Sequence, residues 1–318
     1  MRRIFRSLVA VALLALAVFV AAARNGWMQP ADDELRARYG LPNSHDIMVG
    51  AQKLHYVDEG SGPVIVLVHG SYASLRQWQA WVDVLKANYR VIRFDRPGMG
   101  LSGPNPDSRY DGDAEAALIG KFADQLKLAR FTLVGTSSSG EGVAHFAAQH
   151  PERLQGLILA NIAAGPIKMN TSHLTPRFKR VLAIEKWLGG WHLRAFWDEI
   201  LKMNFTDPAK VTPALVREWT ELNNRMQGNP RKPWPGGKPP FSGTPDDLKA
   251  ITTPTLLLWS DSDHETSAET HGQKTLALLA AKDKQLTVIP HCGHMMPGEC
   301  GPESVAAALP FLRTITTP

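Results

Sequence analysis

A serine-rich turn in the middle of the chain is the first place where residue types and spacing suggest chemistry. Residues 131–142, FTLVGTSSSGEG, read as a buried strand that runs into a tight turn and then a helix. A nucleophile on such a turn has a strained backbone, so the residues two before and two after it must be small. Gly135 and Ser139 flank Ser137 in this way. The pattern predicts Ser137 as a nucleophile at the amino end of a helix, where developing negative charge is favoured.

This turn departs from the glycine-x-serine-x-glycine pattern at one position, because Ser139 stands in place of the last glycine. An elbow centred on Ser138 would be flanked by Thr136 and Gly140 instead. A β-branched threonine fits a crowded turn worse than a glycine does. Ser137 is therefore favoured and Ser138 is the alternative, while a serine-rich helix cap is the interpretation without chemistry.

A serine hydroxyl needs a base held by hydrogen bonding, and that base is usually histidine. The chain has 11 histidines, of which His294 stands out, because it follows an apolar strand and Gly293 permits a sharp loop. His291 lies closer to the end of the strand and is the competitor. His69 ends another strand within a His-Gly pair, whose expected role is to shape that loop.

The acid that orients the base should follow a strand between the nucleophile and the base in chain order. One such strand ends in Asn161, which offers only an amide, whereas residues 255–259 are followed by Asp261 and Asp263. Asp263 is preferred because it lies further into the loop and can turn toward the imidazole. Asp261 is the alternative, and two surface caps of the next helix are the interpretation without chemistry.

Two backbone N–H groups should stabilise the oxyanion, one after the nucleophile and one from the loop after an earlier strand. Ser138 supplies the first. The apolar run at 64–68 opens into a glycine-containing loop, so Ser71 is expected to supply the second, with Tyr72 as the nearest alternative.

Short apolar runs that alternate with helical patterns are expected to position these residues. Most of the runs are continuous, which is typical of strands buried on both faces of a parallel sheet. Repeated strand-then-helix units imply right-handed crossovers and a sheet between two helix layers. The sequence therefore predicts an α/β fold with a mostly parallel, doubly wound sheet. The expected strands are residues 54–58, 64–68, 90–95, 131–134, 157–160, 255–259 and 286–289.

The alternation stops at residues 165–248, where strand signals vanish and five tryptophans occur. We interpret this range as a helical cap over the carboxyl ends of the strands, where ligands bind in open α/β sheets. The alternative is a helical subdomain whose tryptophans fill only its own core. A breaker-rich stretch at 229–240 follows the helices, and the core comprises residues 53–164 and 249–318. The expected cap helices are residues 175–188, 192–203 and 212–226.

The amino terminus has the layout of a targeting segment. Three arginines among the first six residues precede an uncharged apolar run at 8–23, and Arg24 follows. Small residues at the end of the run suit a signal peptidase, whereas the polar stretch beyond it suits a retained anchor. Residues 1–24 are thus expected to be a signal peptide or a membrane anchor, and residues 25–52 a linker. Either places the body outside the cytoplasm, secreted, periplasmic or anchored to the membrane.

Composition and cysteine usage exclude several classes of function. Hydrophobic residues make up 44% and charged residues 20%, as in ordinary globular proteins. The net charge of +5 comes without a long basic run, which argues against nucleic-acid binding. Cys292 and Cys300 flank His294 and would brace its loop as a disulfide, or remain free thiols. A Cys-x-His pair with one further cysteine lacks the spacing of a metal site.

Five motifs in this order resemble those of the α/β-hydrolase superfamily, and the similarity runs from about residue 54 to residue 312. The resemblance implies a covalent acyl-enzyme cycle without a cofactor, in which Ser137 attacks a carbonyl, His294 moves the proton and Asp263 orients it. Serine at position 137 argues against members with an aspartate nucleophile, such as haloalkane dehalogenases and epoxide hydrolases. The motifs are HGS at 69–71, FDRPGMGLS at 94–102, GTS at 135–137, WSDSD at 259–263 and CGH at 292–294.

The serine members that the chain resembles share one architecture and differ in substrate, which the cap selects. They include esterases, lipases, lactonases, prolyl aminopeptidases, carbon–carbon bond hydrolases and cofactor-free haloperoxidases. Ester hydrolysis is the expectation, with an apolar acyl or aromatic small molecule as substrate because the cap is rich in tryptophan. A non-catalytic small-molecule binder on the same fold is the competing class, and the complete Ser, Asp and His set speaks against it.

Overall fold

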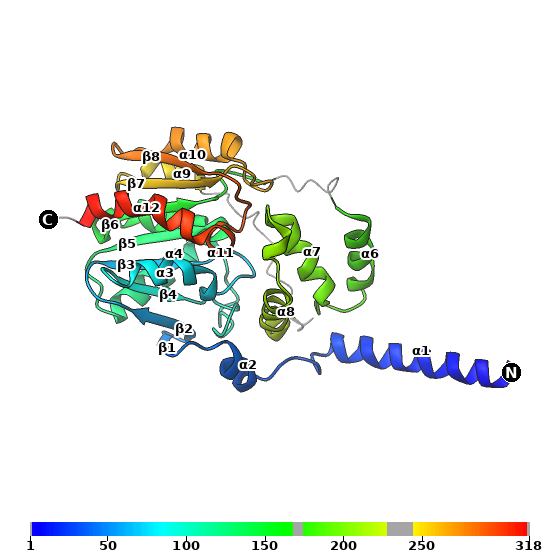
Figure 1. The fold of residues 1–318 in the computed structure, drawn as a ribbon. Coiled ribbons are helices and arrows are strands. Elements are labelled where there is room, and N and C mark those ends of the chain that lie inside the picture. Colours follow the sequence, from blue (N-terminus) through cyan, green and yellow to red (C-terminus); the bar gives the residue numbers. More distant parts are fainter. Residues whose placement is uncertain (1, 168–173, 228–243, 317–318) are drawn as a thin grey trace.

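An eight-stranded sheet forms the centre of the protein in a computed structural model that describes residues 2–167, 174–227 and 244–316 (Figure 1). Its strand order is β1-β2-β4-β3-β5-β6-β7-β8. The pairs β1–β2 and β2–β4 are antiparallel and the other neighbours are parallel, so the strands from β3 to β8 end at one edge. The strands are β1 Ser44–Val49, β2 Gln52–Glu59, β3 Val64–Val68, β4 Arg90–Phe94, β5 Phe131–Thr136, β6 Leu154–Ala160, β7 Thr255–Ser260 and β8 Lys284–Ile289.

The predicted α/β class and all seven expected strands are confirmed, but the segment at 25–52 is not the linker that the sequence suggested. It contains the helix α2 (Asp32–Tyr39) and the edge strand β1, which pairs with β2 along its whole length. The reason for the error is burial: β1 has a buried side chain only at Val49, so it lacks the apolar run of an interior strand.

Helices cover both faces of the sheet, and each central strand divides its side chains between two hydrophobic layers. On β3, Val66 and Val68 belong to the layer that includes α4 and α5, whereas Ile65 and Leu67 belong to the layer that includes α3 and α12. This burial on both faces explains why the strand reads as an uninterrupted apolar run. The helices of the layers are α3 Gln79–Leu85, α4 Gly112–Gln125, α5 Gly140–Gln149, α9 Thr244–Ala250, α10 Gln273–Leu278, α11 Met296–Glu299 and α12 Gly301–Thr316.

Three helices that we call the cap helices follow β6 in the chain and lie beside the sheet rather than on its faces (Figure 1). They occupy the ranges in which helices were expected. Trp197 and Trp219 are buried in a hydrophobic cluster that consists mainly of cap residues but also includes Ala73 of the core, so these two tryptophans do not fill only the cap's own core. Trp187 is exposed, and Trp234 and the breaker-rich stretch lie outside the described residues. The cap helices are α6 Pro176–Glu185, α7 Arg194–Asn204 and α8 Pro213–Gln227.

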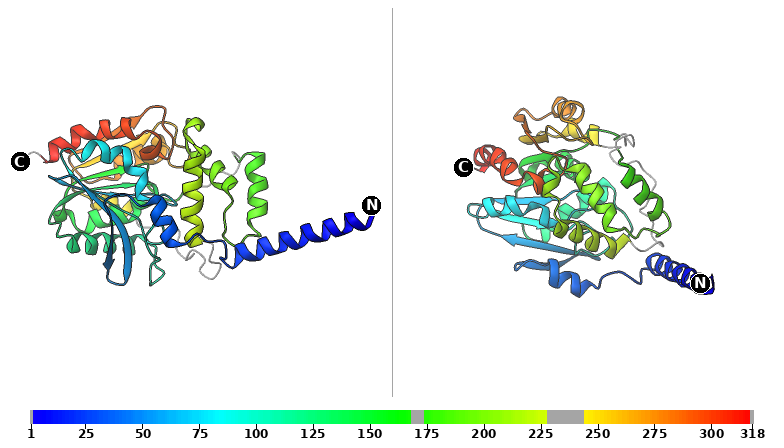
Figure 2. Two further views of the ribbon diagram at one scale, coloured as in Figure 1. Left: turned by 60° about the horizontal axis from the view of Figure 1, so that its bottom comes forward. Right: turned by 45° about the vertical axis from the view of Figure 1, so that its right-hand side comes forward.

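At the amino terminus, α1 (Arg2–Arg24) projects from the body as a single long helix (Figure 2). It has 23 residues with a mean hydropathy of 2.5 in its most apolar window, which by length and composition is enough to cross a membrane; signal sequences share these features. Ala23 is buried where the helix meets the body, and the preceding residues up to Phe19 are exposed.

Candidate active site

Ser137 lies at the turn between β5 and α5, where the sequence placed it. Its φ of +52° is in the left-handed region, which is the strained backbone expected of a nucleophile elbow. A Cβ at Gly135 would come within 2.8 Å of Val143 Cγ2 and 3.1 Å of Ser139 Oγ, so glycine is required two residues before Ser137. A Cβ at Gly70 would lie 3.0 Å from Ser137 Cβ, which shows how closely the loop after β3 approaches the turn.

Ser139, the departure from the glycine pattern, stabilises this turn. Its buried hydroxyl accepts the backbone N–H of Thr136 at 2.9 Å and lies within hydrogen-bond distance of the carbonyl oxygens of Thr136 and Val68. The side chain therefore ties the end of β5 to the end of β3 across the elbow. A serine at this position is compatible with the elbow because its hydroxyl has backbone partners.

The structure brings the three predicted side chains together in one hydrogen-bonded chain. His294 Nε2 lies 2.8 Å from Ser137 Oγ, and His294 Nδ1 lies 2.7 Å from Asp263 Oδ2. These residues follow β5, β7 and β8, whose carboxyl ends meet at the same edge of the sheet. With the proton on Nδ1, the imidazole donates to the carboxylate and accepts from the hydroxyl, which is the arrangement a general base needs.

The competing residues lie elsewhere. His291 is exposed, and its backbone N–H donates to Asp261 Oδ2 at 2.9 Å. Asp261 also accepts the N–H of Cys292, so its carboxylate holds loop backbone rather than an imidazole. The hydroxyl of Ser138 accepts from the hydroxyl of Ser71 at 2.8 Å, which directs it toward the loop after β3.

Asp263 is buried and fully hydrogen-bonded. Its Oδ1 accepts the backbone N–H groups of Glu265 at 2.8 Å and Thr266 at 2.9 Å, and its Oδ2 accepts the Thr266 hydroxyl at 2.8 Å. Burial alone would raise the pKa of this carboxyl, but the charge and hydrogen bond of His294 and the two hydrogen bonds from Thr266 hold the pKa below its usual range. The carboxylate is therefore ionised and fixed in orientation.

His294 is buried between two carboxylates. Burial opposes its charged form, but Asp263 and, at 3.5 Å from Nε2, the half-exposed Glu265 stabilise the imidazolium and raise the pKa of His294 to about 9. Only the neutral imidazole accepts a proton from Ser137, so activity should fall as the pH drops below this pKa. Glu265 was not identified from the sequence, because its closeness to Nε2 depends on how the loop after β7 folds.

Replacing Glu265 by glutamine is expected to shift the acid limb of the kcat/KM profile to lower pH. The substitution removes a negative charge that favours the imidazolium, so the pKa of His294 falls and more of the base is neutral at a given acidic pH. The Glu265 side chain is 43% exposed, so solvent screening should keep the shift below about one pH unit. The measurement is a pH profile of ester hydrolysis. The control is Glu152→Gln, which removes the same charge at an exposed position before β6 and should leave the acid limb of the profile unchanged.

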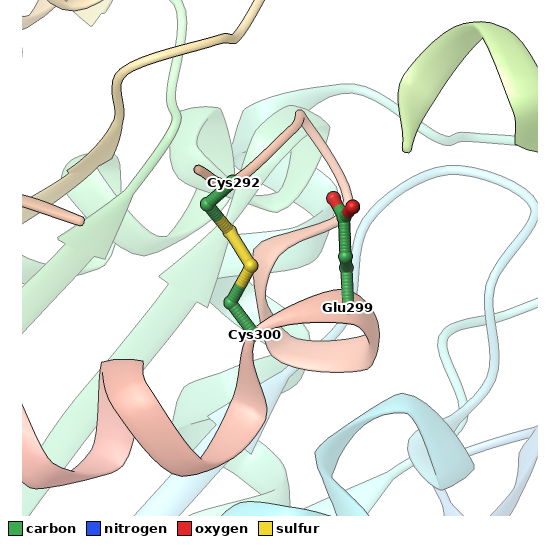
Figure 3. A group of neighbouring side chains, drawn as sticks. All are labelled: Cys292, Glu299 and Cys300. Carbon is green, nitrogen blue, oxygen red and sulfur yellow. A yellow bond between two sulfur atoms is a disulfide. The ribbon is translucent and has the colours of Figure 1, made fainter. Parts of the chain in front are cut away.

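The loop that carries His294 is held by a disulfide and a buried carboxylate (Figure 3). Cys292 and Cys300 are bonded, with Cα atoms 6.1 Å apart. Glu299 accepts the N–H of Gly293 at 2.8 Å and that of Asp207 at 2.8 Å, which joins the loop to the segment after α7. The two sulfurs and the Glu299 carboxylate lie close enough to suggest a metal site, but bonded sulfurs offer no thiolate ligand.

The double substitution Cys292→Ser and Cys300→Ser, which removes this disulfide, is expected to lower the free energy of unfolding but to leave the reactivity of Ser137 largely unchanged. A loop closed across 8 positions stabilises by about 2.5 kcal/mol in the chain-entropy model, or about 4 °C in Tm for a chain of this size. Thermal unfolding and fluorophosphonate labelling are measured together. Because Glu299 still holds the loop, labelling should persist at 25 °C; its complete loss in a folded variant would contradict this account.

Asn161 is a second support of the His294 loop and was passed over in the sequence as only an amide. It is buried at the end of β6 with φ of +48°, a conformation that asparagine tolerates. Its side-chain N–H groups donate to the Ser260 hydroxyl at 2.9 Å and the His294 carbonyl at 3.1 Å, and its oxygen accepts the Ser260 N–H at 2.9 Å. The amide thereby fixes the end of β7 and the backbone of the base.

The loop after β3 places the expected oxyanion donors beside the nucleophile. Within the part of the chain that the structure describes, the N–H groups of Ser71 and Tyr72 have no backbone acceptor, so both the predicted donor and its alternative are available. Tyr72 has φ of +62°, its carbonyl accepts from Asn223 of α8 at 2.9 Å, and its ring contacts Trp197 of α7. The cap therefore holds this loop.

A buried ion pair between Arg96 and Glu115 contacts both the turn that carries Ser138 and the loop after β3. Arg96 contacts Glu115 through Nε at 2.6 Å and Nη2 at 2.8 Å, and its Nη1 donates to the Ser138 hydroxyl at 2.9 Å. His69 is buried and donates from Nδ1 to the Gly70 carbonyl, while its Nε2 accepts the Arg96 N–H. Burial lowers the pKa of His69 to about 4, so it is neutral and shapes the loop, as expected.

Comparisons with known proteins identify the family and support the fold. A model of the Alpha/beta hydrolase family matches residues 65–308. A 2-hydroxy-6-oxononadienedioate/2-hydroxy-6-oxononatrienedioate hydrolase of Escherichia coli is 27% identical over 260 residues, which cover 76% of this chain and 84% of that protein. The family match includes the strands from β3 to β8 and all three residues of the hydrogen-bonded chain.

Solved structures share the fold at lower identity. A membrane phospholipase A, described as a bacterial virulence factor, has a TM-score of 0.68 at 23% identity, with 100% of both chains covered. An esterase from Thermogutta terrifontis has a TM-score of 0.67 at 24% identity, with 86% of this chain and 99% of that one covered. From the family match and the shared fold together, the chain belongs to the α/β-hydrolase family.

Proposed function

We propose that the protein is a serine hydrolase that cleaves a carboxylic ester or related acyl bond through an acyl-enzyme intermediate. The observation that carries this proposal is the unbroken hydrogen-bonded chain from Ser137 through His294 to Asp263. Each member is buried or half-buried at the carboxyl edge of the sheet, where the elbow conformation of Ser137 directs its hydroxyl toward the imidazole.

In the proposed cycle, Ser137 Oγ attacks the substrate carbonyl while His294 Nε2 takes the hydroxyl proton. Asp263 stabilises the imidazolium that forms and keeps its ring in place. The backbone N–H groups of Ser138 and Ser71 stabilise the tetrahedral oxyanion. His294 then protonates the leaving group, and a water molecule, deprotonated by the same imidazole, releases the acyl group. No step requires a cofactor.

Carbon–carbon bond hydrolysis is the second candidate, because the curated relative reported above is a hydrolase of 2-hydroxy-6-oxo dienedioates. Its identity of 27% over most of both chains does not determine which bond this chain cleaves. The two reactions are separated by assaying p-nitrophenyl esters of increasing chain length against a 2-hydroxy-6-oxo dienedioate. Turnover of the esters alone supports the first proposal, and a clear preference for the dienedioate supports the second.

A fluorophosphonate probe tests the serine assignment in the full chain. Labelling is expected in the native protein and in Ser138→Ala, and its loss is expected in Ser137→Ala. Labelling that survives Ser137→Ala and disappears in Ser138→Ala would reverse the assignment. Absence of labelling in every form would instead favour a non-catalytic small-molecule binder.

We also propose that the catalytic body lies outside the cytoplasm, with α1 as a membrane anchor or a signal segment. Arginines precede the apolar stretch of α1, which favours their retention on the cytoplasmic side. The disulfide between Cys292 and Cys300 fits an oxidising compartment. We further propose that the substrate is a small molecule with an apolar acyl group.

A further inference from the structure

The cap helix α6 carries an exposed face that its own fold leaves uncovered. Its inward side is formed by Phe178, Val181 and Glu185, which are buried. Leu182 is 37% exposed and Ile184 is 53% exposed. Large apolar side chains in contact with water on a short amphipathic helix indicate a surface that binds something apolar.

Leu182 and Ile184 lie on opposite flanks of the helix, and the exposed side between them is basic. Lys179 and Arg180 are exposed and, among the described residues, form no ion pair with a carboxylate; the same holds for Lys186. Trp187, in the turn that follows the helix, is 61% exposed. At 100° per residue, Lys179 and Arg180 lie on the side of the helix opposite to its buried side. We call this surface, formed by Lys179, Arg180, Leu182, Ala183, Ile184, Lys186 and Trp187, the α6 face.

The position of α6 relative to α1 identifies what would cover this face. Figures 1 and 2 show α6 lying crosswise to α1, as the cap helix farthest from the sheet on the side toward which α1 projects. The turn that follows α6 contacts the body end of α1: the Arg24 Nη1 donates to the Trp187 carbonyl at 3.5 Å, and a Cβ at Gly189 would lie 3.1 Å from Arg24 Cγ. The α6 face is thus continuous with the end of the apolar helix.

A helix of 23 residues is about 34 Å long, close to the thickness of the hydrocarbon layer of a bilayer. When α1 crosses a bilayer, a helix that lies crosswise at its body end lies flat on the membrane surface. Trp27, three residues after the body end of α1, is 73% exposed. Tryptophan is favoured at the headgroup level, and lysine and arginine bind anionic headgroups.

We propose that the α6 face rests on the surface of a bilayer that contains anionic lipids, with Trp187 among the headgroups and the three basic side chains against lipid phosphates. This contact would set the cap directly on the membrane, so that apolar acyl substrates reach the protein from the bilayer. The proposal rests on the extracytoplasmic, anchored placement proposed above, and it does not depend on the hydrolytic chemistry.

The test uses the full chain in nanodiscs of phosphatidylcholine and phosphatidylglycerol. Both native cysteines are in a disulfide, so a single new cysteine can be labelled with an environment-sensitive dye. Ala183→Cys places the dye on the α6 face, and Ala306→Cys, an exposed alanine of α12 on the far side of the body, is the matched control. Nitroxides attached to the lipid headgroups are expected to quench the dye at position 183 several-fold more than the dye at position 306.

Two further variants, made in the Ala183→Cys background, separate binding from simple nearness to the anchor. Trp187→Ala, and the joint change of Lys179, Arg180 and Lys186 to glutamine, should each weaken the quenching, and phosphatidylcholine alone should weaken it as well. Equal quenching at positions 183 and 306, or quenching that neither variant changes, would overturn the proposal. A blue shift of the dye without lipid quenching would do so too, because it indicates packing against a second copy of the chain. Fluorophosphonate labelling of each variant reports separately on the active site.

Discussion

Replacing His294 by alanine is expected to lower kcat for ester hydrolysis by about 10⁵- to 10⁶-fold, nearly to the level left by loss of the nucleophile. The reason is that Ser137 Oγ has its only imidazole partner in the described structure at His294 Nε2, 2.8 Å away. Without a base the hydroxyl stays protonated, and what remains comes from binding and the oxyanion donors. Single-turnover and steady-state rates with a p-nitrophenyl ester measure the loss.

His291→Ala is the matched control for this variant. His291 occupies the same loop but is exposed, and its link to Asp261 runs through the backbone N–H, which alanine retains. Its turnover should stay within a few-fold of the native value. A loss in His291→Ala as large as that in His294→Ala would mean that the loop rearranges and that the wrong histidine has been assigned.

The second large effect is expected at Asp263, where replacement by asparagine should lower kcat by about 10⁴-fold. An amide in place of the carboxylate no longer stabilises the imidazolium, and its N–H₂ group favours the tautomer with the proton on Nε2, which cannot accept from Ser137. The loss of negative charge also lowers the pKa of His294 from its value of about 9, so the acid limb should move to lower pH while the plateau falls. A pH profile of kcat/KM shows both changes together.

Asp261→Asn tests whether that effect is specific. The two Asp261 carboxylate oxygens accept the N–H groups of His291 and Cys292, and asparagine, with one side-chain oxygen, can keep one of these two hydrogen bonds. A small loss of stability with nearly native turnover is the expected result. If Asp261→Asn were the slow variant and Asp263→Asn the active one, the orienting acid would have to be reassigned.

Strands β3, β4, β5, β6 and β7 were predictable because their side chains are buried on both faces, which leaves a nearly continuous apolar run in the sequence. Strands β2 and β8 are partly exposed and were predicted from shorter apolar runs. The edge strand β1 and helix α2 were missed for the opposite reason. Their side chains are mostly exposed, and their structure depends on pairing with β2 and packing against the body. Ser137, His294 and Asp263 were found because each stands at a fixed place in a local strand-to-loop pattern, although their roles stay a prediction until the variants are measured.

The supporting residues had no such local signal. Arg96 reaches Ser138 from a loop 42 positions earlier, and Asn161 reaches the His294 backbone across 133 positions. A contact of this kind exists only once the strands are in register, so the sequence offers at most a polar residue at a strand end as a hint. Ser139 is the converse case: in the sequence it is a departure from the elbow pattern, and in the structure its hydroxyl binds the backbone on both sides of the elbow.

The attachment of Tyr72 to two cap helices constrains how this protein can acquire new specificities. Its carbonyl is held by Asn223 and its ring by Trp197, so any rearrangement of α7 or α8 also moves the backbone beside Ser71. Changes at Trp197 or Asn223 are therefore expected to alter both the substrate preference and the catalytic rate. Evolution or engineering that retunes selectivity while preserving speed should keep Trp197 and Asn223 and vary the remainder of the cap.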